Sequence, residues 1–457
     1  MAKKFEEIYI GETDPQFLRH IVQRPSASLR RLITKKGVTD EDIKKGLTDN
    51  AFTKKSRTEI LSSLDVMACG IGLTGGGDSA GIADLLSSLG LNLDPNLTML
   101  GVKNAGAGLV TEPAKFEDQL IIVDPLLAKD FEGQASTPLK SARVNAMKDN
   151  PENTKANIAP YKFVYGTGGD DHLGLLAKIA EAFPEKSVVG TFKSIDGDGC
   201  INGKPAQMLG FRTAMKKYQE DFWAIVQNAY THDQVHVVEF FGRKSGKLPF
   251  EALRKFPINF DSLPREEKRK IEEFRDGILI LVPEKPTSLE KIAQEVKKIK
   301  EQEGFCVVAV AEGFVPTTPT ESASSETTHI SKNSDIQQKK DSFGNIANLS
   351  GIRHIIISAI QNFAGIQKVN ELLENYTARG ATPTKYDSTM GKKIGAQMAK
   401  LINEGTTGGH AVVYFEGTDA EKDEPTIVPL IDVSNKNTLN NSDLYNDEML
   451  RENGVFW

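Results

Sequence analysis

Cysteine is scarce in this chain, and its few thiols are widely separated. The 457 residues include 3 cysteines, Cys69, Cys200 and Cys306. An odd number at such long spacing does not form the disulfide framework of a small secreted protein, so the sequence predicts a reducing, cytoplasmic location. Cys200 stands beside an acidic loop, but no histidine is near it in the sequence. A structural role is therefore favoured over a catalytic one.

Long apolar runs and an excess of positive charge are also missing. No apolar run approaches the ~20 residues of a membrane span, and the first residues, MAKKFEEIYIGE, contain no apolar signal region. The net charge is −6 and charges of both signs are mixed, which argues against general nucleic-acid binding. The length allows one large domain or two of ordinary size, with a sizeable core.

The most informative stretch is 165–214, together with the apolar residues just before it. Its parts follow in the order strand, glycine-rich acidic loop, helix, short strand and second acidic loop: 161–165, 166–171, 173–183, 188–189 and 193–199. This order is expected of a parallel α/β sheet. Loops at the carboxyl ends of neighbouring parallel strands share one crevice. The sequence therefore predicts several carboxylates and one lysine around one ligand, as in a metal-assisted phosphoryl transfer site.

The two acidic loops resemble those of the phosphofructokinases. The first loop ends in GGDD (168–171), the second begins KSIDGD (193–198), and GFRTA follows at 210–214. The pair Asp171 and Lys193 resembles the pyrophosphate-dependent branch, since ATP-using members usually have glycine at the position of Asp171. The resemblance covers roughly residues 65–430. It implies an α/β fold of two Rossmann-like, three-layer lobes, with the site in the cleft.

The resemblance also assigns roles within the acidic loops. It implies that Asp170 and Asp198 bind Mg²⁺, a hard cation that takes carboxylate and phosphate oxygens. Lys193 would neutralise charge that develops on pyrophosphate, and Asp196 would be the general base for the acceptor hydroxyl. Asp171 would disfavour an ATP α-phosphate. Without the resemblance, DGDG could equally be a turn with side-chain hydrogen bonds or part of a calcium loop.

Other donor-binding residues come from two further segments. GGDSAGIA (76–83) resembles the family's first phosphate loop, with Ala80 for proline and Ala83 for asparagine. Glycine lets the backbone approach an anion, although such a turn can also be only a tight corner. TPLKSAR (137–143) resembles the segment whose arginine contacts the donor; alternatively, Arg143 is a solvated surface residue. The implied donor-binding residues are Gly76, Gly77, Arg143, Gly169 and Asp171.

The acceptor side is implied by three motifs in the second half of the chain. GRKSGKL (242–248), AEG (311–313) and YTARGATP (376–383) resemble family segments that contact the sugar phosphate. Arg243 would act on the transferring phosphoryl group or its acceptor, as a catalytic residue. The other implied sugar-phosphate residues are Ser194, Gly242, Glu312, Tyr376 and Arg379.

Two positions depart from the family pattern on the acceptor side. Gln234 and Asn370 stand where many members have arginines that reach a sugar phosphate across a subunit interface. His236 lies within an apolar strand-like run, where a buried core histidine is favoured. The acceptor sugar is therefore less certain than the donor.

The domain organisation follows from the same comparison. We expect an N-terminal helical extension (1–60), a donor-binding lobe (61–213 plus about 375–410), a sugar-phosphate lobe (214–374 plus about 411–430) and a C-terminal tail (431–457) that is irregular from Asn435. The polar stretch 315–340 predicts a mobile loop. The segment DSFGN (341–345) resembles the pyrophosphate branch's D-x-FGH, with Asn345 for histidine.

The expected function is Mg²⁺-dependent transfer of phosphate from pyrophosphate to the 1-hydroxyl of fructose 6-phosphate, a glycolytic and possibly reversible step. A homodimer or homotetramer is expected, without nucleic-acid or membrane partners. Three alternatives stay open: another sugar phosphate such as sedoheptulose 7-phosphate, ATP as donor, and a non-catalytic regulatory relative. The matching base Asp196 argues against the last.

Overall fold

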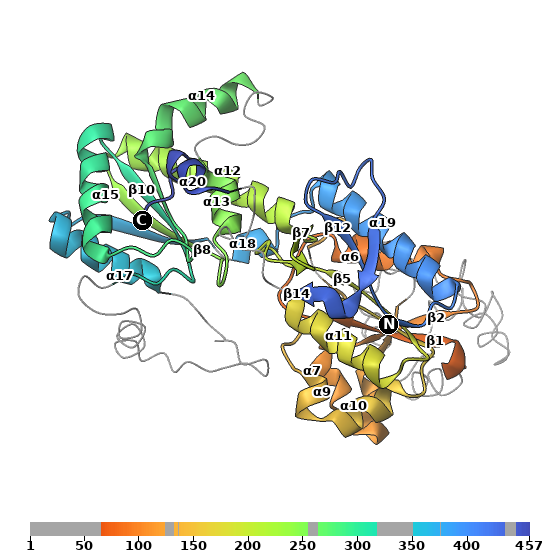
Figure 1. Ribbon diagram of the computed structural model, residues 1–457. Helices are drawn as coiled ribbons and strands as arrows, with labels where there is room; N and C mark the ends of the chain where they lie inside the picture. Colours follow the sequence, from red (N-terminus) through yellow and green to blue (C-terminus); the bar gives the residue numbers. More distant parts are fainter. Residues whose placement is uncertain are drawn as a thin grey trace, which may run out of the picture. The chain divides into compact units, whose positions relative to one another are not determined.

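The computed structural model describes residues 65–123, 132–135, 137–254, 264–317, 351–374, 376–434 and 445–457. The predicted N-terminal extension, nearly all of the predicted loop 315–340 and the DSFGN segment lie outside these residues. The chain divides into two compact units (Figure 1). Unit 1 consists of Met1–Ser194, Gly199–Gly210 and Thr382–Asn435; unit 2 consists of Ile195–Asp198, Phe211–Ala381 and Lys436–Trp457.

Unit 1 is built on a ten-stranded sheet. Its strand order is β14-β6-β7-β12-β5-β4-β1-β2-β3, and β13 pairs with β12. The five central neighbours β12, β5, β4, β1 and β2 are parallel, whereas β3, β7 and β13 pair antiparallel. The strands are β1 (Cys69–Thr74), β2 (Thr98–Val102), β3 (Leu120–Ile122), β4 (Phe163–Gly168), β5 (Ser187–Phe192), β6 (Cys200–Ile201), β7 (Lys204–Gln207), β12 (Gly408–Phe415), β13 (Thr426–Pro429) and β14 (Val433–Ser434).

Helices cover both faces of this sheet. The α-helices of unit 1 are α6 (Ile82–Asn92), α7 (Gly106–Leu109), α9 (Ala146–Asp149), α10 (Pro151–Ile158), α11 (Asp170–Ala182) and α19 (Lys385–Asn403). Side chains alternate along the strands: Phe163, Tyr165 and Val189 pack with α6 and α19. On the opposite face, Gly166 and Gly190 approach Leu176 of α11. Since both faces are covered, β1, β4 and β5 are buried at every position.

Unit 2 has a smaller sheet of the same kind. Four parallel strands follow the order β11-β8-β10-β9. The strands are β8 (Val235–Phe240), β9 (Ile278–Leu281), β10 (Cys306–Ala311) and β11 (Val369–Glu374). The α-helices are α12 (Phe211–Thr231), α13 (Lys247–Leu253), α14 (Arg265–Phe274), α15 (Leu289–Glu303), α17 (Ile352–Ala359), α18 (Tyr376–Arg379) and α20 (Asp447–Glu452).

Alternation along β8 again separates two hydrophobic clusters. Val238 and Phe240 pack with α12 and α13, whereas Val235 and Val237 face α15 and α17. Each unit therefore has three layers, helices over both faces of a largely parallel sheet. This confirms the predicted α/β fold of two three-layer lobes. Short single turns complete the described secondary structure: η1 (Val66–Ala68), η2 (Pro113–Gln119), η4 (Arg275–Gly277), η5 (Ile360–Ala364) and η6 (Leu430–Asp432).

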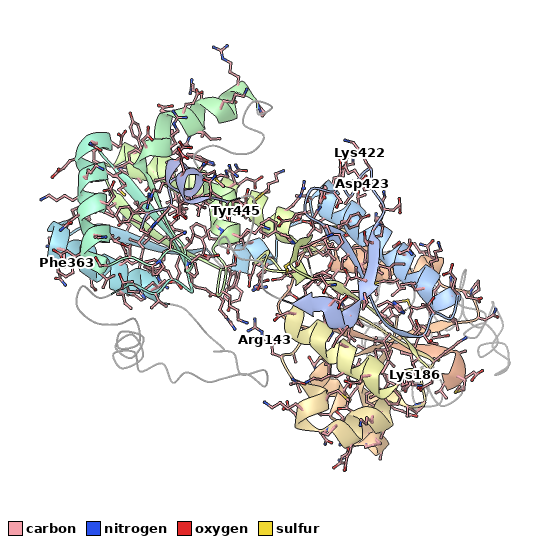
Figure 2. The ribbon with its side chains drawn as sticks, in the orientation of Figure 1. Arg143, Lys186, Phe363, Lys422, Asp423 and Tyr445 are labelled. Atoms are coloured by element: carbon pink, nitrogen blue, oxygen red, sulfur yellow. The ribbon has the colours of Figure 1, made fainter. Side chains whose placement is uncertain are left out.

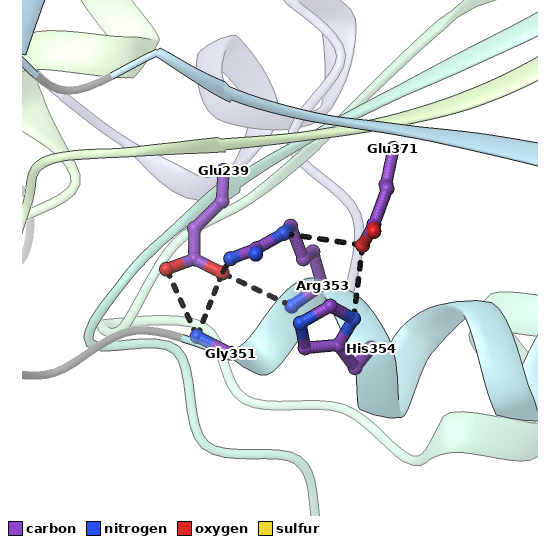
Figure 3. Close-up of polar contacts among 5 residues, drawn as sticks. All are labelled: Glu239, Gly351, Arg353, His354 and Glu371. Carbon is purple, nitrogen blue, oxygen red and sulfur yellow. Dashed lines mark hydrogen bonds and ion pairs between the residues drawn. The ribbon is translucent and has the colours of Figure 1, made fainter.

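A buried carboxylate fixes the start of α17 in unit 2 (Figure 3). Glu239 on β8 is 0 % exposed, and its oxygens accept the backbone N–H groups of Gly351 and Arg353 at 3.0–3.2 Å. The Arg353 guanidinium lies 3.2 Å from Glu239 and 3.3 Å from Glu371 on β11, which also contacts His354. Glu239 thus caps the helix and has a cationic partner, so its burial is compensated.

The predicted division of the second half of the chain was wrong. Strand β12 pairs with β5 in unit 1, so residues 411–430 belong to the first unit and not to the second lobe. The stretch from Asn435 is not wholly irregular either, because it contains α20 (Asp447–Glu452). Ile280 of β9 exchanges backbone hydrogen bonds with Gly454 and Phe456, which places the C-terminal residues against the sheet of unit 2. None of the helices in the described part of the chain is long and apolar enough to span a membrane.

Candidate active site

The carboxyl ends of three parallel strands gather the candidate residues of unit 1. Strands β1, β4 and β5 lie side by side, with Thr74 paired to Thr167 and Gly168 to Phe192. The loops that follow are joined by backbone hydrogen bonds, from Gly75 to Thr167 (2.9 Å) and from Lys193 to Gly168 (2.8 Å). The first acidic loop and Lys193, at the start of the second, therefore lie together, while the expectation that both acidic loops face one ligand stays a prediction.

Lys193 lies against the first glycine-rich loop. Its side chain is 3 % exposed, and its Nζ donates a hydrogen bond to the carbonyl of Gly77. Gly76 has φ +80°, a conformation that favours glycine, and a Cβ at this position would stand 3.1 Å from the Lys193 ammonium. The fold thus places one buried cation beside the loop where the sequence predicts a phosphate.

The segment that carries Arg143 is fixed to the same strand end. Thr74 Oγ1 donates to the carbonyl of Lys140 (2.8 Å), and the Ser141 hydroxyl donates to the carbonyl of Gly76. Arg143 follows two residues later, and its side chain is exposed (Figure 2). The structure therefore brings the predicted donor arginine onto the segment that supports the Gly76 loop.

Helix α11 starts directly at the acidic pair. Gly169 is its N-cap, and Asp170 and Asp171 occupy the first turn, where carboxylates are favoured by the helix dipole. A Cβ at Gly169 would meet nothing within 4 Å, and its φ of −74° suits any residue, so packing does not require glycine there. Both aspartates are half-buried. Space and carboxylate oxygens therefore occur together at this helix start.

His172 is a buried residue that the motifs did not single out. Its ring occupies the space that a Cβ at Gly75 or Gly168 would need, so those two glycines are explained by packing. Burial and the nearby charge of Lys193 lower the pKa of His172 to about 4, although a hydrogen bond to the Leu73 carbonyl acts in the opposite direction and raises it. The ring is thus neutral and separates the two glycine-rich loops. Its position directly after GGDD was the only sequence signal.

In unit 2, the candidate residues also follow parallel strands. Gly242 and Arg243 come after β8, Glu312 after β10, and Tyr376 and Arg379 lie on α18 after β11. The Glu312 N–H donates to the carbonyl of Phe240 (2.8 Å). Gly242 has φ +150°, and a Cβ there would meet the Ser245 carbonyl, so this position requires glycine.

Four charged side chains influence one another at these strand ends. Burial, followed by the charge of Asp196, raises the pKa of Glu312 from 4.5 to about 8. Arg243 and Arg379 oppose that shift. The fold therefore brings Asp196, Arg243, Glu312 and Arg379 into one electrostatic group, although their numbers differ by more than 180.

Aromatic rings hold the arginine and tyrosine of α18. The Arg379 guanidinium lies 4.3 Å from the centroid of the Phe241 ring, which Tyr376 meets edge-on at 5.9 Å. Tyr376 itself is 75 % exposed. Phe241 therefore provides a platform for Arg379.

Asp198 has a buried lysine nearby. Burial lowers the pKa of Lys247 to about 8, while Glu251 and Asp198 raise it. Lys247 is buried and its ammonium lies 5.6 Å from the Phe211 ring. This lysine was not singled out from the sequence, where it belongs to the GRKSGKL segment.

The predicted metal residues are divided between the units. Asp170 belongs to unit 1 and Asp198 to unit 2. The described residues contain no group of three or more histidine, cysteine or acidic side chains that could hold a metal ion. Magnesium does not need such a group, because it is commonly bound by one or two carboxylates and substrate phosphates. Asp170, half-buried beside the open space at Gly169, fits that donor set.

Gln234 and Asn370 form a neutral network with His236. The Asn370 amide nitrogen lies 2.6 Å from Gln234 Oε1 and 3.1 Å from His236 Nε2. His236 is 4 % exposed, which confirms the predicted core histidine. The two departures from the family pattern are thus in direct contact with each other.

Residues 70–255 match the family model for phosphofructokinase. This range begins in β1 and includes the Gly76 loop, both acidic loops and Arg243. These residues therefore form a phosphofructokinase domain. Glu312, Tyr376 and Arg379 lie beyond the matched range.

The chain is similar both to enzymes named for pyrophosphate and to enzymes named for ATP. It is 25 % identical over 376 residues to the pyrophosphate–fructose 6-phosphate 1-phosphotransferase of Dictyoglomus thermophilum, covering 80 % of this chain and 93 % of the relative. The enzyme of the same name from Amycolatopsis methanolica is 26 % identical over 76 % of this chain and 90 % of its own length. ATP-dependent 6-phosphofructokinase 1 of Synechocystis is 25 % identical, and the match covers 73 % of this chain and 84 % of the relative.

Solved structures agree on the fold. A pyrophosphate-dependent phosphofructokinase from Nitrosospira multiformis superposes with a TM-score of 0.56 at 14 % identity, covering 80 % of this chain and 84 % of that chain. Phosphofructokinase from Saccharomyces cerevisiae gives a TM-score of 0.56 at 17 % identity, over 79 % of this chain and 45 % of that chain. The two-unit α/β architecture is therefore that of the phosphofructokinases.

Proposed function

We propose that the protein transfers phosphate from pyrophosphate to the 1-hydroxyl of fructose 6-phosphate, with Mg²⁺. The observation that carries the donor half is the position of Lys193, buried against the Gly76–Gly77 loop beside the start of α11. A compact cation and helix N–H groups suit a donor that is almost entirely phosphate. Asp171 in the first turn of α11 adds negative charge where a longer donor would continue.

The acceptor half rests on the charged group of unit 2. Asp196 accepts the proton of the sugar 1-hydroxyl as its oxygen attacks phosphorus, and the bond from phosphorus to the leaving phosphate breaks. Lys193, Arg143 and Arg243 neutralise charge on the transferring group. Mg²⁺, held by Asp170 and Asp198, supplies further charge neutralisation when bound. Glu312, Tyr376 and Arg379 bind the sugar phosphate, with Ser194 and Gly242.

One observation favours a different acceptor. Gln234 and Asn370, which stand where the family resemblance suggests arginines, bind each other and His236 instead. A neutral network attracts a phosphate less than two guanidinium groups do. Sedoheptulose 7-phosphate is therefore the second candidate acceptor. A homodimer or homotetramer in the cytoplasm and a reversible, glycolytic reaction complete the proposal.

The test crosses two donors, pyrophosphate and ATP, with two acceptors, fructose 6-phosphate and sedoheptulose 7-phosphate, using purified protein and Mg²⁺. Turnover with pyrophosphate and fructose 6-phosphate is expected. Turnover with the other acceptor alone would move the substrate and keep the donor. ATP-dependent turnover alone would overturn the donor assignment, and no turnover in any combination would favour a non-catalytic relative.

A further inference from the structure

A buried serine in the first glycine-rich loop of unit 1 donates a hydrogen bond to a distant segment. Ser79 is 0 % exposed, and its Oγ donates to the carbonyl of Leu209 at 2.7 Å, although the two residues are 130 positions apart. Because the residue is fully buried, its hydroxyl acts inside the protein and does not face a ligand. The family resemblance gives Ser79 no role, and the proposed phosphate transfer does not use it.

Leu209 is in turn attached to the strand end that carries Lys193. Its N–H donates to the carbonyl of Phe192 (3.3 Å), and Lys193 forms an isolated parallel bridge with Leu209. The Lys193 Nζ returns to the carbonyl of Gly77, two residues before Ser79. These contacts close a hydrogen-bonded ring that runs from Gly77 through Lys193 and Leu209 to Ser79 and back along the chain.

The segments of this hydrogen-bonded ring are packed too closely for side chains at two glycines. Gly210 has φ +93°, and a Cβ there would collide with Ser79 Oγ. Gly81 has φ +87°, and a Cβ there would stand 2.7 Å from the Leu209 side chain. The N–H of Gly210 donates to Oδ1 of Asp387, which is 0 % exposed, at 3.1 Å. Backbone and buried side chains therefore support the ring from both sides.

The hydrogen-bonded ring holds Lys193 at both ends of its side chain. The main chain is fixed through Leu209, and the ammonium is fixed at Gly77. A lysine ammonium stands on a flexible stem, so without such support it would occupy several positions. A cation stabilises charge on a transferring phosphate best when it is already in place before the reaction.

We propose that Ser79 is a positioning residue for donor binding, which holds Lys193 against the Gly76–Gly77 loop through Leu209. The effect on catalysis rests on the proposed function, since that function assigns Lys193 to the donor. The hydrogen-bonded ring itself does not depend on it. Two experiments therefore separate the ring from its consequence.

Hydrogen exchange followed by mass spectrometry tests the ring without any substrate. The reporting amides are those of Lys193 and Leu209, which donate to the carbonyls of Gly168 and Phe192. Ser79→Ala should raise the exchange rates of both amides at least about tenfold, because the ring is opened.

Ser88→Ala is the matched control for this measurement. It removes another buried serine hydroxyl, which donates from α6 to the carbonyl of Lys392 (2.6 Å), and should leave both reporting amides unchanged. If Ser79→Ala leaves the exchange of Lys193 and Leu209 unchanged, whatever happens within 75–83, Ser79 does not hold Lys193 and the proposal is wrong.

A double-mutant cycle with Lys193→Met tests the consequence for the donor. Ser79→Ala should lower kcat/KM for pyrophosphate about tenfold when Lys193 is present but less than about twofold in Lys193→Met, because its effect passes through Lys193. Equal losses in the two backgrounds would show that Ser79 acts through stability alone and would overturn the proposal. Absence of pyrophosphate turnover in the wild type would instead overturn the proposed function, and the exchange rates would then decide whether Ser79 positions Lys193.

Discussion

The two units place their candidate residues at equivalent positions but use different chemistry there. In unit 1 the carboxyl ends of β1, β4 and β5 present glycine-rich backbone, a helix start and one buried lysine. In unit 2 the ends of β8, β10 and β11 present one carboxylate and two arginines, which form one electrostatic group with Asp196. Backbone N–H groups recognise phosphate without regard to its attachments, whereas side chains distinguish hydroxyls from charges.

This difference has a consequence for the division of labour between the units. A site made of backbone and a single cation suits a ligand of uniform chemistry, such as pyrophosphate. A site with carboxylates and guanidinium groups suits a ligand that offers both hydroxyls and a phosphate, such as a sugar phosphate. We therefore expect changes in unit 1 to act on the donor and changes in unit 2 to act on the acceptor and the proton transfer.

The largest effect is expected at Asp196 in unit 2. Asp196→Asn removes the proposed base while keeping the shape, and should lower turnover about 10²–10⁴-fold with little change in the free energy of unfolding. Steady-state kinetics and urea unfolding measure the two quantities. Asp221→Asn, an ion-paired residue on α12, is the control and should keep full turnover. If the turnover of Asp196→Asn stays within tenfold of the wild type, Asp196 is not the general base.

Lys193 in unit 1 should give the next largest effect. Lys193→Met removes the cation at the Gly76–Gly77 loop and should lower turnover with pyrophosphate about 10²–10³-fold. The measurement is kcat and KM for each substrate, with the larger KM change expected for pyrophosphate.

A second buried lysine in unit 1 provides the matched control. Lys186 Nζ donates to the carbonyls of Ala159 (2.9 Å) and Tyr161 (2.6 Å), away from the glycine-rich loops (Figure 2). Lys186→Met should lower the free energy of unfolding but leave kcat per folded molecule unchanged. Equal losses of kcat in both variants would mean that Lys193 acts only through stability.

The sequence predicted the features that are encoded locally. Apolar runs followed by glycine-rich loops predicted the strand ends, and the donor residues share the first unit because they lie close in the sequence. Partners that are far apart along the chain were not predictable in this way. Glu239 was placed within an apolar strand, but the residues that neutralise it, Gly351 and Arg353, stand more than a hundred positions later.

The errors have the same origin. Residues 411–430 were assigned to the second lobe, but the pairing of β12 with β5, more than 200 residues earlier, decides that they belong to unit 1. The loop glycines also differ in their reasons: Gly75 and Gly168, to which the motifs assigned no role, make room for His172. A motif therefore identifies a loop more reliably than the reason for each residue in it.

A pH-dependent effect on stability is expected in unit 2 at Glu312. Its pKa is raised from 4.5 to about 8 in the folded protein, so between these values the folded state holds a proton that the unfolded chain has released. The free energy of unfolding should therefore fall as pH rises through this window, by at most about 1.4 kcal/mol per pH unit for one proton. Urea unfolding at about pH 5.5 and about pH 7, each about one unit inside the window, measures the slope.

Glu312→Gln should flatten that slope, because glutamine does not titrate. Glu290→Gln, an exposed residue of α15, should leave it unchanged. The same slope in the wild type and in Glu312→Gln would show that the carboxylate of Glu312 is ionised in the folded protein, and the two carboxylates and two arginines of this group would then balance in charge.

The smallest effects on activity are expected from two exposed residues, one in each unit. These residues should also distinguish donor binding from acceptor binding most clearly. Arg143 is exposed on the segment that supports the Gly76 loop, and Tyr376 is 75 % exposed on α18. Because neither side chain is part of a core, alanine at either position should change the free energy of unfolding by less than about 0.5 kcal/mol. Each substitution should change the KM for only one of the two substrates.

Arg143→Ala should raise the KM for pyrophosphate about tenfold and leave the KM for the sugar phosphate unchanged, since it removes a charged hydrogen bond worth about 1.5–3 kcal/mol. Tyr376→Ala should raise the KM for the sugar phosphate and leave the KM for pyrophosphate unchanged. If Arg143→Ala instead raises the KM for the sugar phosphate, unit 1 would contribute to both substrates. The backbone of unit 1 would then select phosphate in general, and the choice between donor and acceptor would depend on unit 2 alone.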